Sequence, residues 1–312
     1  MLIGEPSNTE RPTSNRSNST RGHGLFAVGC IKARLAGRRG LGFNAGGMSD
    51  FEMRFGGLAR LYGRAGLARL RAAHVCVVGV GGVGTWAVEA LARSGVGALT
   101  LVDLDEICVT NINRQLPALT ETVGQAKVAV MAERVRAINP DCQVRAEQQF
   151  FNAASAAELL APKYDFVLDA IDSVTNKVLL LAQCRERGRP VLACGGAGGR
   201  RDATLVRCAD LAKVSHDRLL AEVRKRLRQE HGFPADGQDL GIECVYSAEA
   251  PVFAQPDGSV CAQRPAATAD GARLNCNGGL GSAVFVTGTF GFAAAGRVVA
   301  ALAGAGTARD ED

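Results

Sequence analysis

A glycine-rich turn followed by an acidic residue could hold the phosphates and ribose of a nucleotide. Residues 79–84 read Gly-Val-Gly-Gly-Val-Gly, between an apolar β-branched run and a segment of good helix formers. Glycines permit a tight turn there, and free N–H groups at the start of a helix attract phosphate. Asp103 follows about 20 residues later, where a carboxylate accepts hydrogen bonds from ribose hydroxyls. The predicted phosphate contacts of the turn are Gly79, Gly81, Gly82 and Gly84.

Two cations downstream of the turn indicate which nucleotide is bound. The glycine pattern alone fits NAD, FAD and ATP equally well. Arg114 lies in a polar stretch after the second predicted strand, and Lys127 lies early in the next predicted helix. Cleavage of ATP between the α- and β-phosphates needs cations on those oxygens, because negative charge builds there in the transition state. Hydride transfer has no such need, so we predict catalytic roles on ATP for Arg114 and Lys127.

A pair of acids lies at the end of the fourth predicted strand. Asp169 and Asp172 lie where strands of an α/β sheet present their carboxyl ends to a ligand. A carboxylate at this edge can hold Mg²⁺ against phosphates, whereas the other acid could simply cap the following helix. We assign the metal and a catalytic role to Asp172.

Alternating strands and helices must position these residues. The hydrophobic pattern predicts strands over residues 74–78, 98–103, 143–149, 166–170 and 190–194. Helices are predicted after the glycine turn and over about 124–138, 153–160 and 174–187. This alternation predicts an α/β fold with a doubly wound, mostly parallel sheet of the Rossmann-like kind.

The pattern divides the chain into three segments. Residues 48–200 are predicted to form the ATP-binding adenylation core. In residues 201–312 the alternation weakens, which predicts a C-terminal α+β extension. Its predicted elements are strands near 204–207, 243–247 and 259–262, a basic helix within 211–230 and an apolar segment over 280–304.

Residues 1–47 are predicted to form a disordered basic tail. They hold six Arg and one Lys against two Glu, whereas 29 basic and 29 acidic residues balance in the remainder. The composition could imitate a mitochondrial presequence, but the simpler interpretation is that translation starts at Met48. No secretory signal is recognisable, and we expect a cytoplasmic protein.

The predicted basic helix offers a local surface for nucleic acid. A neutral body excludes a uniformly basic domain, so RNA phosphates would need such a patch. A solvated charged face is the alternative interpretation. The candidate RNA contacts are Arg218, Arg224, Lys225, Arg226 and Arg228.

Residues 280–296 carry no charge and would be flagged as a membrane span by hydropathy. The run is shorter than the ~20 residues that a spanning helix needs, and Gly, Ser and Thr dilute it. We therefore expect a buried core helix or a dimer-interface helix, and no membrane.

The ten cysteines include no C-x-x-C pair, which argues against a zinc ribbon or a thioredoxin-like site. Most are expected to be reduced, buried thiols of a cytoplasmic protein. Cys244 lies in a polar, glycine-flanked region and could take an acyl group from AMP as a thioester. The alternative is a strand thiol without a role, because intramolecular cyclisation needs no covalent enzyme intermediate.

Taken together, five motifs resemble the ubiquitin-activating-enzyme-like superfamily, which includes the adenylating proteins of molybdopterin and thiazole synthesis. They are V-V-G-V-G-G-V-G-T (77–85), D-L-D (103–105), N-I-N-R-Q (111–115), V-G-Q-A-K (123–127) and D-A-I-D-S (169–173). The resemblance implies ATP and Mg²⁺ as cofactors, adenylation of a carboxylate, and a homodimer. It also implies that nucleotide is bound by Asp103, Asp105, Asn111, Arg114, Gln115 and Lys127, with Asp172 on the metal.

Further segments resemble the tRNA threonylcarbamoyladenosine dehydratase family within that superfamily. They include R-F-G-G-L-A-R-L-Y-G (54–63), G-G-A-G-G (195–199), E-C-V-Y-S-A-E (243–249) and V-T-G-T-F-G-F (286–292). The resemblance implies ATP-dependent cyclisation of threonylcarbamoyl-adenosine beside the tRNA anticodon. The side-chain carboxylate would be adenylated, and a nucleophile of the same modification would displace AMP.

Departures from the superfamily pattern keep other functions in view. The zinc-binding cysteine pairs of sulfur-carrier activators are missing, and Lys177 stands where the superfamily pattern has Arg. One alternative is an adenylating activator of a ubiquitin-like sulfur carrier. Another is a non-catalytic ATP-binding adaptor of a cysteine desulfurase, which the resemblance implies as a partner. A nicotinamide oxidoreductase is opposed by Arg114 and Lys127. The sequence does not locate a site for the monovalent cation that is a further cofactor candidate.

Overall fold

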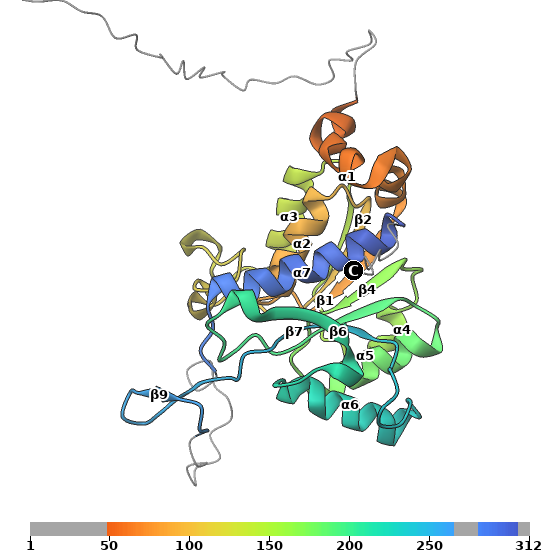
Figure 1. The fold of residues 1–312 in the computed structure, drawn as a ribbon. Helices are drawn as coiled ribbons and strands as arrows, with labels where there is room; N and C mark the ends of the chain where they lie inside the picture. The colour runs from red at the N-terminus through yellow and green to blue at the C-terminus, as the bar shows by residue number, and fades with distance from the viewer. Residues whose placement is uncertain (1–48, 265–279, 305–312) are drawn as a thin grey trace, which may run out of the picture. The chain divides into compact units, whose positions relative to one another are not determined.

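Seven strands form one sheet, and helices cover both of its faces (Figure 1). The computed structural model describes residues 49–264 and 280–304. The strands of the sheet are β1 (His74–Val78), β2 (Ala98–Val102), β3 (Gln143–Glu147), β4 (Phe166–Asp169), β5 (Val191–Cys194), β6 (Val206–Asp210) and β7 (Glu243–Ser247). The helices are α1 (Asp50–Ala72), α2 (Gly84–Arg93), α3 (Lys127–Ile138), α4 (Ala156–Leu159), α5 (Val174–Glu186), α6 (Arg218–His231) and α7 (Val284–Leu302).

The strand order confirms the predicted doubly wound α/β class. The order is β3-β2-β1-β4-β5-β7-β6, and every neighbouring pair is parallel except β6 with β7. The chain runs outward from β1 to β3 and then returns to place β4 on the other side of β1. This reversal leaves a crevice at the carboxyl ends of β1 and β4, which is where α/β sheets bind ligands.

The two central strands are apolar on both faces. Val75, Cys76, Val77 and Val78 of β1 are buried, as is all of β4. A continuous apolar run of this kind is typical of parallel strands with helices on both sides. In Figure 1, α1, α2, α3 and α7 lie on one face of the sheet, and α4, α5 and α6 lie on the other.

The segment after residue 200 contributes to the same sheet. β6 and β7 extend it beyond β5, in parallel register for β7 and antiparallel register for β6. Two short strands, β8 (Phe253–Ala254) and β9 (Val260–Cys261), form a separate antiparallel pair. The predicted tail of residues 1–47 lies outside the described residues, and the division at residue 200 stays a prediction.

The apolar C-terminal segment forms α7, which packs along α2. Its residues Val286, Phe290, Ala294 and Val298 recur every four positions and are fully buried. Length and composition alone would let this helix cross a membrane, and half of its most apolar window is buried within the fold. Burial of one face against α2 fits the expectation of a core helix.

Helix α1 is an element that the hydrophobic pattern did not predict. It starts with a capping box, in which Ser49 Oγ accepts from Glu52 N and Glu52 Oε2 accepts from Ser49 N at 2.8 Å. Gly63 interrupts its regular geometry with φ +73. Several glycines in this stretch disfavour helix, and burial of Phe51 and Phe55 in an apolar cluster with Leu67 and beside Gly95 offsets that preference.

The close packing of α7 on α2 gives a stability prediction. A Cβ atom on Gly291 would lie 2.6 Å from both Trp86 Cβ and Val83 O. We expect Gly291→Ala to lower the free energy of unfolding by about 1–3 kcal/mol, because the two helices would have to separate. Gly296→Ala on the same helix meets nothing within 4 Å and should be neutral or stabilising. Urea unfolding measures both, and equal effects of the two substitutions would contradict this packing argument.

Candidate active site

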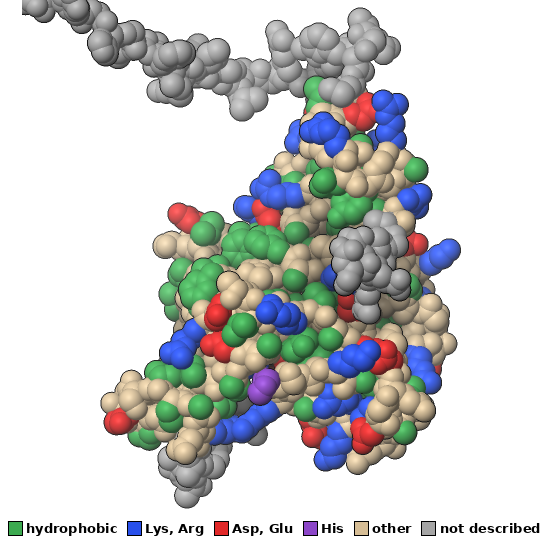
Figure 2. Space-filling model, in the orientation of Figure 1, with side chains coloured by type: hydrophobic (Ala, Val, Ile, Leu, Met, Phe, Trp, Pro, Cys, Tyr) green, Lys and Arg blue, Asp and Glu red, His purple; other side chains and the backbone are tan. Residues whose placement is uncertain are grey.

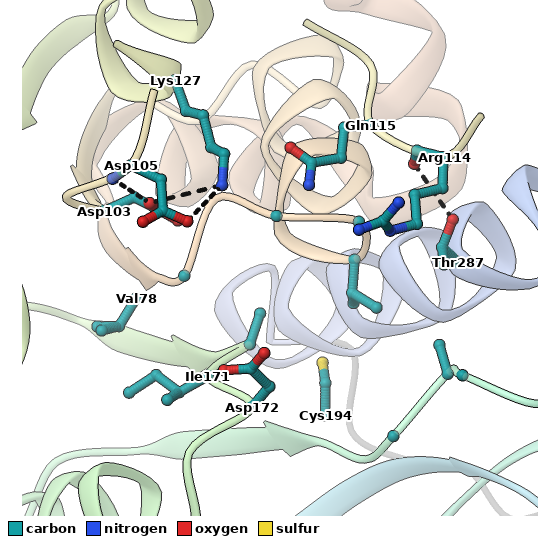
Figure 3. A pocket seen from close by; sticks show the side chains of 18 of the residues that line it. Val78, Asp103, Asp105, Arg114, Gln115, Lys127, Ile171, Asp172, Cys194 and Thr287 are labelled. Atoms are coloured by element: carbon teal, nitrogen blue, oxygen red, sulfur yellow. Dashed lines mark hydrogen bonds and ion pairs between the residues drawn. The ribbon is translucent and has the colours of Figure 1, made fainter. Parts of the chain in front are cut away.

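A cavity of about 620 Å³ opens at the carboxyl ends of the central strands. Four strand ends contribute to its lining, through the turns that follow β1, β2, β4 and β5. Its volume lies in the range of small-molecule and cofactor sites. Ten of the lining residues are labelled in Figure 3.

The glycine turn forms the wall that follows β1. Gly79 has φ +93, and a Cβ there would lie 2.7 Å from Ala170 O in the turn after β4. A Cβ on Gly84 would lie 1.8 Å from Gly79 O, so neither position accepts a side chain. Gly81 and Gly82 line the cavity just before α2 begins. The turn therefore presents backbone N–H groups and a helix N-terminus to a ligand.

Asp103 links the glycine turn to the end of β2. Its Oδ2 accepts from Val80 N at 2.7 Å, and its Oδ1 accepts from Asp105 N at 2.9 Å. Lys127 Nζ lies 2.7 Å from Asp105 Oδ2 and 4.0 Å from Asp103 Oδ1. The Lys127 side chain is buried, and Asp105 is its one hydrogen-bond partner among the described residues. Ammonium protons thus remain available to a phosphate in the cavity.

Arg114 is fastened to two helices through its own backbone. Its carbonyl accepts from Trp86 Nε1 at 3.0 Å on α2 and from Thr287 Oγ1 at 3.3 Å on α7. The guanidinium donates to Thr110 O at 2.8 Å and Asn113 Oδ1 at 3.0 Å, and its stem lies over Gly82. The cation is therefore oriented toward the cavity by local contacts.

Two amides complete this wall. Asn111 is buried, and its Oδ1 accepts from Cys108 N at 3.1 Å. Gln115 is also buried, and its Oε1 has no hydrogen-bond partner among the described residues. Figure 3 shows Lys127, Gln115 and Arg114 along one side of the cavity, with Asp172 on the opposite side. A buried amide without a partner is typical of a site that a ligand completes.

The acid that ends β4 and the acid that follows it have different surroundings. Asp169 is fully buried and pairs with the equally buried Lys177 at 2.8 Å. Burial raises the pKa of Asp169, and the charge of Lys177 opposes that shift. Asp172 is exposed and lines the cavity, so it is the acid that a ligand can reach.

Asp172 also fits the chemistry of a magnesium site. The described residues contain no group of three or more His, Cys, Asp or Glu side chains that could hold a metal. Mg²⁺ bound with a nucleotide commonly uses one or two carboxylates together with phosphate oxygens and water. An accessible carboxylate that faces two cations across the cavity suits that mode.

The structure does not bring Cys244 to the cavity. The residue is fully buried in β7, between β5 and β6, and its Sγ lies 3.8 Å from Ile242 O. Burial raises its pKa well above the ordinary value. A protonated, inaccessible thiol is a poor nucleophile, so the structure argues against the predicted covalent role.

Four of the five predicted RNA cations have hydrogen-bond or ion-pair partners within the fold. Arg224 Nη1 donates to Leu211 O at 2.9 Å and to Val214 O at 3.0 Å. Arg228 Nε donates to Pro234 O at 2.9 Å, and Arg226 pairs with Glu230 on its own helix. Lys225 is exposed and its Nζ lies 3.9 Å from Glu222 Oε2, and Arg218 is exposed. The helix is therefore not an uninterrupted phosphate-binding face.

Sequence reasoning gave no role to two further walls of the cavity. The glycine run after β5 lines one side, and Leu280, Ser282 and Thr287 before and within α7 line another. The glycine run directly follows a predicted strand, so its place could have been inferred from the edge rule. The contribution of α7 depends on packing over a long sequence separation, for which the sequence holds no local signal.

The fold and the cavity together define an α/β nucleotide-binding protein whose site carries two cations and an accessible carboxylate. A family model described as the ThiF family matches residues 57–309. The chain belongs to the ThiF family.

Named relatives cover most of the chain. It is 50% identical over 246 residues to the tRNA threonylcarbamoyladenosine dehydratase of Escherichia coli (strain K12), covering 78% of this chain and 91% of that protein. It is 46% identical over 253 residues to the Haemophilus influenzae protein of the same name, covering 81% and 94%. The solved structure of TcdA (CsdL) matches with TM-score 0.75 and 46% identity, over 82% of this chain and 97% of that one. The E. coli dehydratase TcdA in complex with ATP matches with TM-score 0.72 and 43% identity, over 82% and 97%.

Cysteine reactivity tests the electrostatics of the site. Hydrogen bonding from Thr110, whose Oγ1 lies 3.3 Å from Cys108 Sγ, lowers the pKa of the Cys108 thiol. More Cys108 is therefore thiolate near neutral pH, whereas the buried Cys244 stays protonated. We expect iodoacetamide to alkylate Cys108 well before Cys244 in the native protein, as measured by peptide mass spectrometry.

Thr110→Val provides the control, because it removes the hydroxyl and should slow alkylation of Cys108. Modification of Cys244 at the rate of Cys108 would contradict the buried placement of the β7 thiol.

Proposed function

We propose that this protein uses ATP to cyclise threonylcarbamoyl-adenosine beside the anticodon of tRNA. The carboxylate of the modification attacks the α-phosphorus of ATP and releases pyrophosphate. A nucleophile of the same modification then attacks the acyl carbon, and AMP leaves. The net change in the nucleoside is the loss of one water, and the hydrolysis of ATP drives it.

One observation carries the proposal: the family match coincides with a cavity equipped for adenylation. A dehydratase of this name is half identical to the chain over nine-tenths of its own length. A related structure at 43% identity is described as a complex with ATP, and another at 44% as a complex with AMP. The cavity gathers Arg114, Lys127 and Asp172 around one space, as adenylate chemistry requires.

Each residue has a role that follows from its position. The glycine turn and Asp103 bind the phosphates and the ribose, with Asn111 and Gln115 adding amide contacts. Lys127 and Arg114 stabilise the charge that develops on the α- and β-phosphate oxygens. Asp172 would hold Mg²⁺, which neutralises phosphate charge when bound. A tethered nucleophile makes an enzyme thioester unnecessary, which agrees with the burial of Cys244.

The alternative functions have weaker support. Sulfur-carrier adenylyltransferases are more distant relatives, at 36% identity over 42% of this chain for the Thermus thermophilus protein. A non-catalytic adaptor would not need Arg114 and Lys127 at the phosphates. A monovalent cation, a cysteine desulfurase partner and a cytoplasmic location stay predictions.

A coupled assay tests the proposed reaction. We expect pyrophosphate release from ATP and Mg²⁺ that depends on tRNA carrying threonylcarbamoyl-adenosine. The digested nucleoside should lose the mass of one water in the same reaction. Release without mass loss would favour the sulfur-carrier function, and ATP binding without release would favour the adaptor.

Lys127→Met is the matched control for the chemical step. It keeps an unbranched side chain, one atom shorter, and removes the charge from the cavity wall. Losing one such transition-state contact lowers turnover by roughly 10²–10³. Full activity of this variant would refute the phosphate role of Lys127 while leaving the substrate assignment intact.

We propose further that the protein is a homodimer through an apolar surface beside the cavity. Large exposed side chains lie on the loop before α3 and on the first half of α7: Val109, Ile112, Leu119, Phe285 and Phe292. Figure 2 shows hydrophobic side chains gathered over these elements. Asn113 Nδ2 joins the two elements by donating to Ser282 O at 2.9 Å. A patch of this kind is typical of protein interfaces, and the superfamily resemblance implies a second copy as its occupant.

Introducing a charge into this apolar patch tests the dimer. We expect Phe285→Asp to give a monomer in sedimentation equilibrium, because a charge in an apolar interface is strongly unfavourable. Val260→Asp on β9 is the control, since Val260 is equally exposed but lies outside the patch. If the wild type were a monomer, or if the Phe285→Asp variant remained a dimer, the proposed dimer interface would be wrong.

A further inference from the structure

A second cavity of about 360 Å³ has no role in the reaction described above. Its walls are the loop before α6, the first two turns of α6 and the segment that leads into β8. Its lining includes Ser215, His216, Arg218, Arg224, Pro251 and Phe253.

The start of α6 separates this cavity from the nucleotide pocket. Arg218 lines the second cavity, whereas the next residue, Leu219, lines the first. Asp217 joins them: its Oδ2 accepts from Gly196 N at 2.8 Å, and its Oδ1 accepts from Leu220 N at 2.9 Å. The first residues of α6 therefore separate the second cavity from the nucleotide pocket.

The second cavity is held in shape by a buried cation. Arg200 is 4% exposed and donates both to His216 O at 2.5 Å and to Glu249 O. These carbonyls belong to the two segments that form opposite walls. His216 adopts φ +56, the one positive φ among the described non-glycine residues. Strained backbone that the surroundings enforce is concentrated at functional sites.

The unused groups of the cavity are cationic and aromatic. Arg218 is exposed and makes no hydrogen bond or ion pair with the described residues, although its guanidinium lies 5.7 Å from the ring centroid of Phe253. Both carboxylate oxygens of Asp217 are already occupied by backbone N–H groups. Among the lining residues, Arg218 and Arg224 outnumber the single carboxylate of Asp217, and the guanidinium of Arg218 lies beside an aromatic ring.

We infer that this cavity binds a nucleotide of the RNA strand next to the residue that is modified. A guanidinium beside an aromatic face suits a phosphate and an unstacked base, as in single-stranded recognition. Arg218 takes the phosphate, and Phe253 stacks on the base. The inference rests on the proposed function, because it needs the modified adenosine to enter the neighbouring pocket.

Binding of a labelled anticodon stem-loop, measured by fluorescence anisotropy, tests the subsite. We expect Arg218→Ala and Phe253→Leu each to weaken binding by roughly tenfold, with Phe253→Leu keeping the apolar packing. Arg218→Ala should also reduce the slope of log affinity against log salt by about 0.7. In the full reaction both variants should raise KM for tRNA and leave KM for ATP unchanged.

Arg187→Ala is the matched control. This exposed arginine lies between α5 and β5, at the opposite edge of the sheet, and donates to Gln183 on its own helix. Its loss should change stem-loop binding by less than about twofold.

The outcomes separate the subsite from the proposed function. Wild-type affinity in both cavity variants, equal losses in Arg187→Ala, or no binding of the stem-loop by the wild type would overturn the subsite. Selective loss of binding in the cavity variants supports it, even if the wild type forms no dehydrated nucleoside, in which case only the proposed reaction fails.

Discussion

The close approach of two backbone turns determines where this protein can bind a ligand. Gly79 after β1 lies against the carbonyl of Ala170 after β4, closer than any side chain would permit. This contact occurs where the strand order reverses, so the turns diverge above it and leave the cavity between them. Asp103 is fixed relative to this point because its Oδ2 accepts a hydrogen bond from Val80 N in the glycine turn. Lys127 lies beside it, through its contacts with Asp103 and Asp105.

The C-terminal helix completes the site from a distance. α7 packs on α2, and Thr287 and Trp86 both donate to the carbonyl of Arg114. The position of Arg114 in the cavity wall therefore depends on three elements that are far apart in the sequence. This arrangement explains why α7 is rich in apolar and small residues. The small residues let it lie close to α2, and Thr287 on the same helix reaches the cavity.

Local sequence signals predicted most of the fold, and long-range pairing accounts for the errors. The glycine turn and the central strands were predicted because apolar runs and glycine positions act over a few residues. Helix α1 was not predicted because its glycines disfavour helix, although Ser49 and Glu52 form a capping box at its start. Two interpretations of Cys244 stayed open in the sequence, because its polar neighbours gave no sign that its strand lies between β5 and β6.

The basic helix shows the same limit. Its arginines resemble a phosphate-binding face in sequence, yet Arg224 and Arg228 donate to carbonyls of the loops on either side of α6. Arginine satisfies several carbonyls at once, so loops without regular structure can be held by a single side chain. Which cations remain free depends on loop paths that the sequence pattern does not specify.

The acid that ends β4 and the acid three residues later have different structural roles. Asp169 is committed to Lys177 in the core, and its Oδ1 accepts from Ile171 N at 3.0 Å. That bond fixes the backbone that carries Asp172 to the cavity. Removing one partner of a buried pair leaves an uncompensated charge, so Asp169 and Lys177 depend on each other. The buried acid therefore sets the geometry, and the exposed acid alone is free to meet a cation.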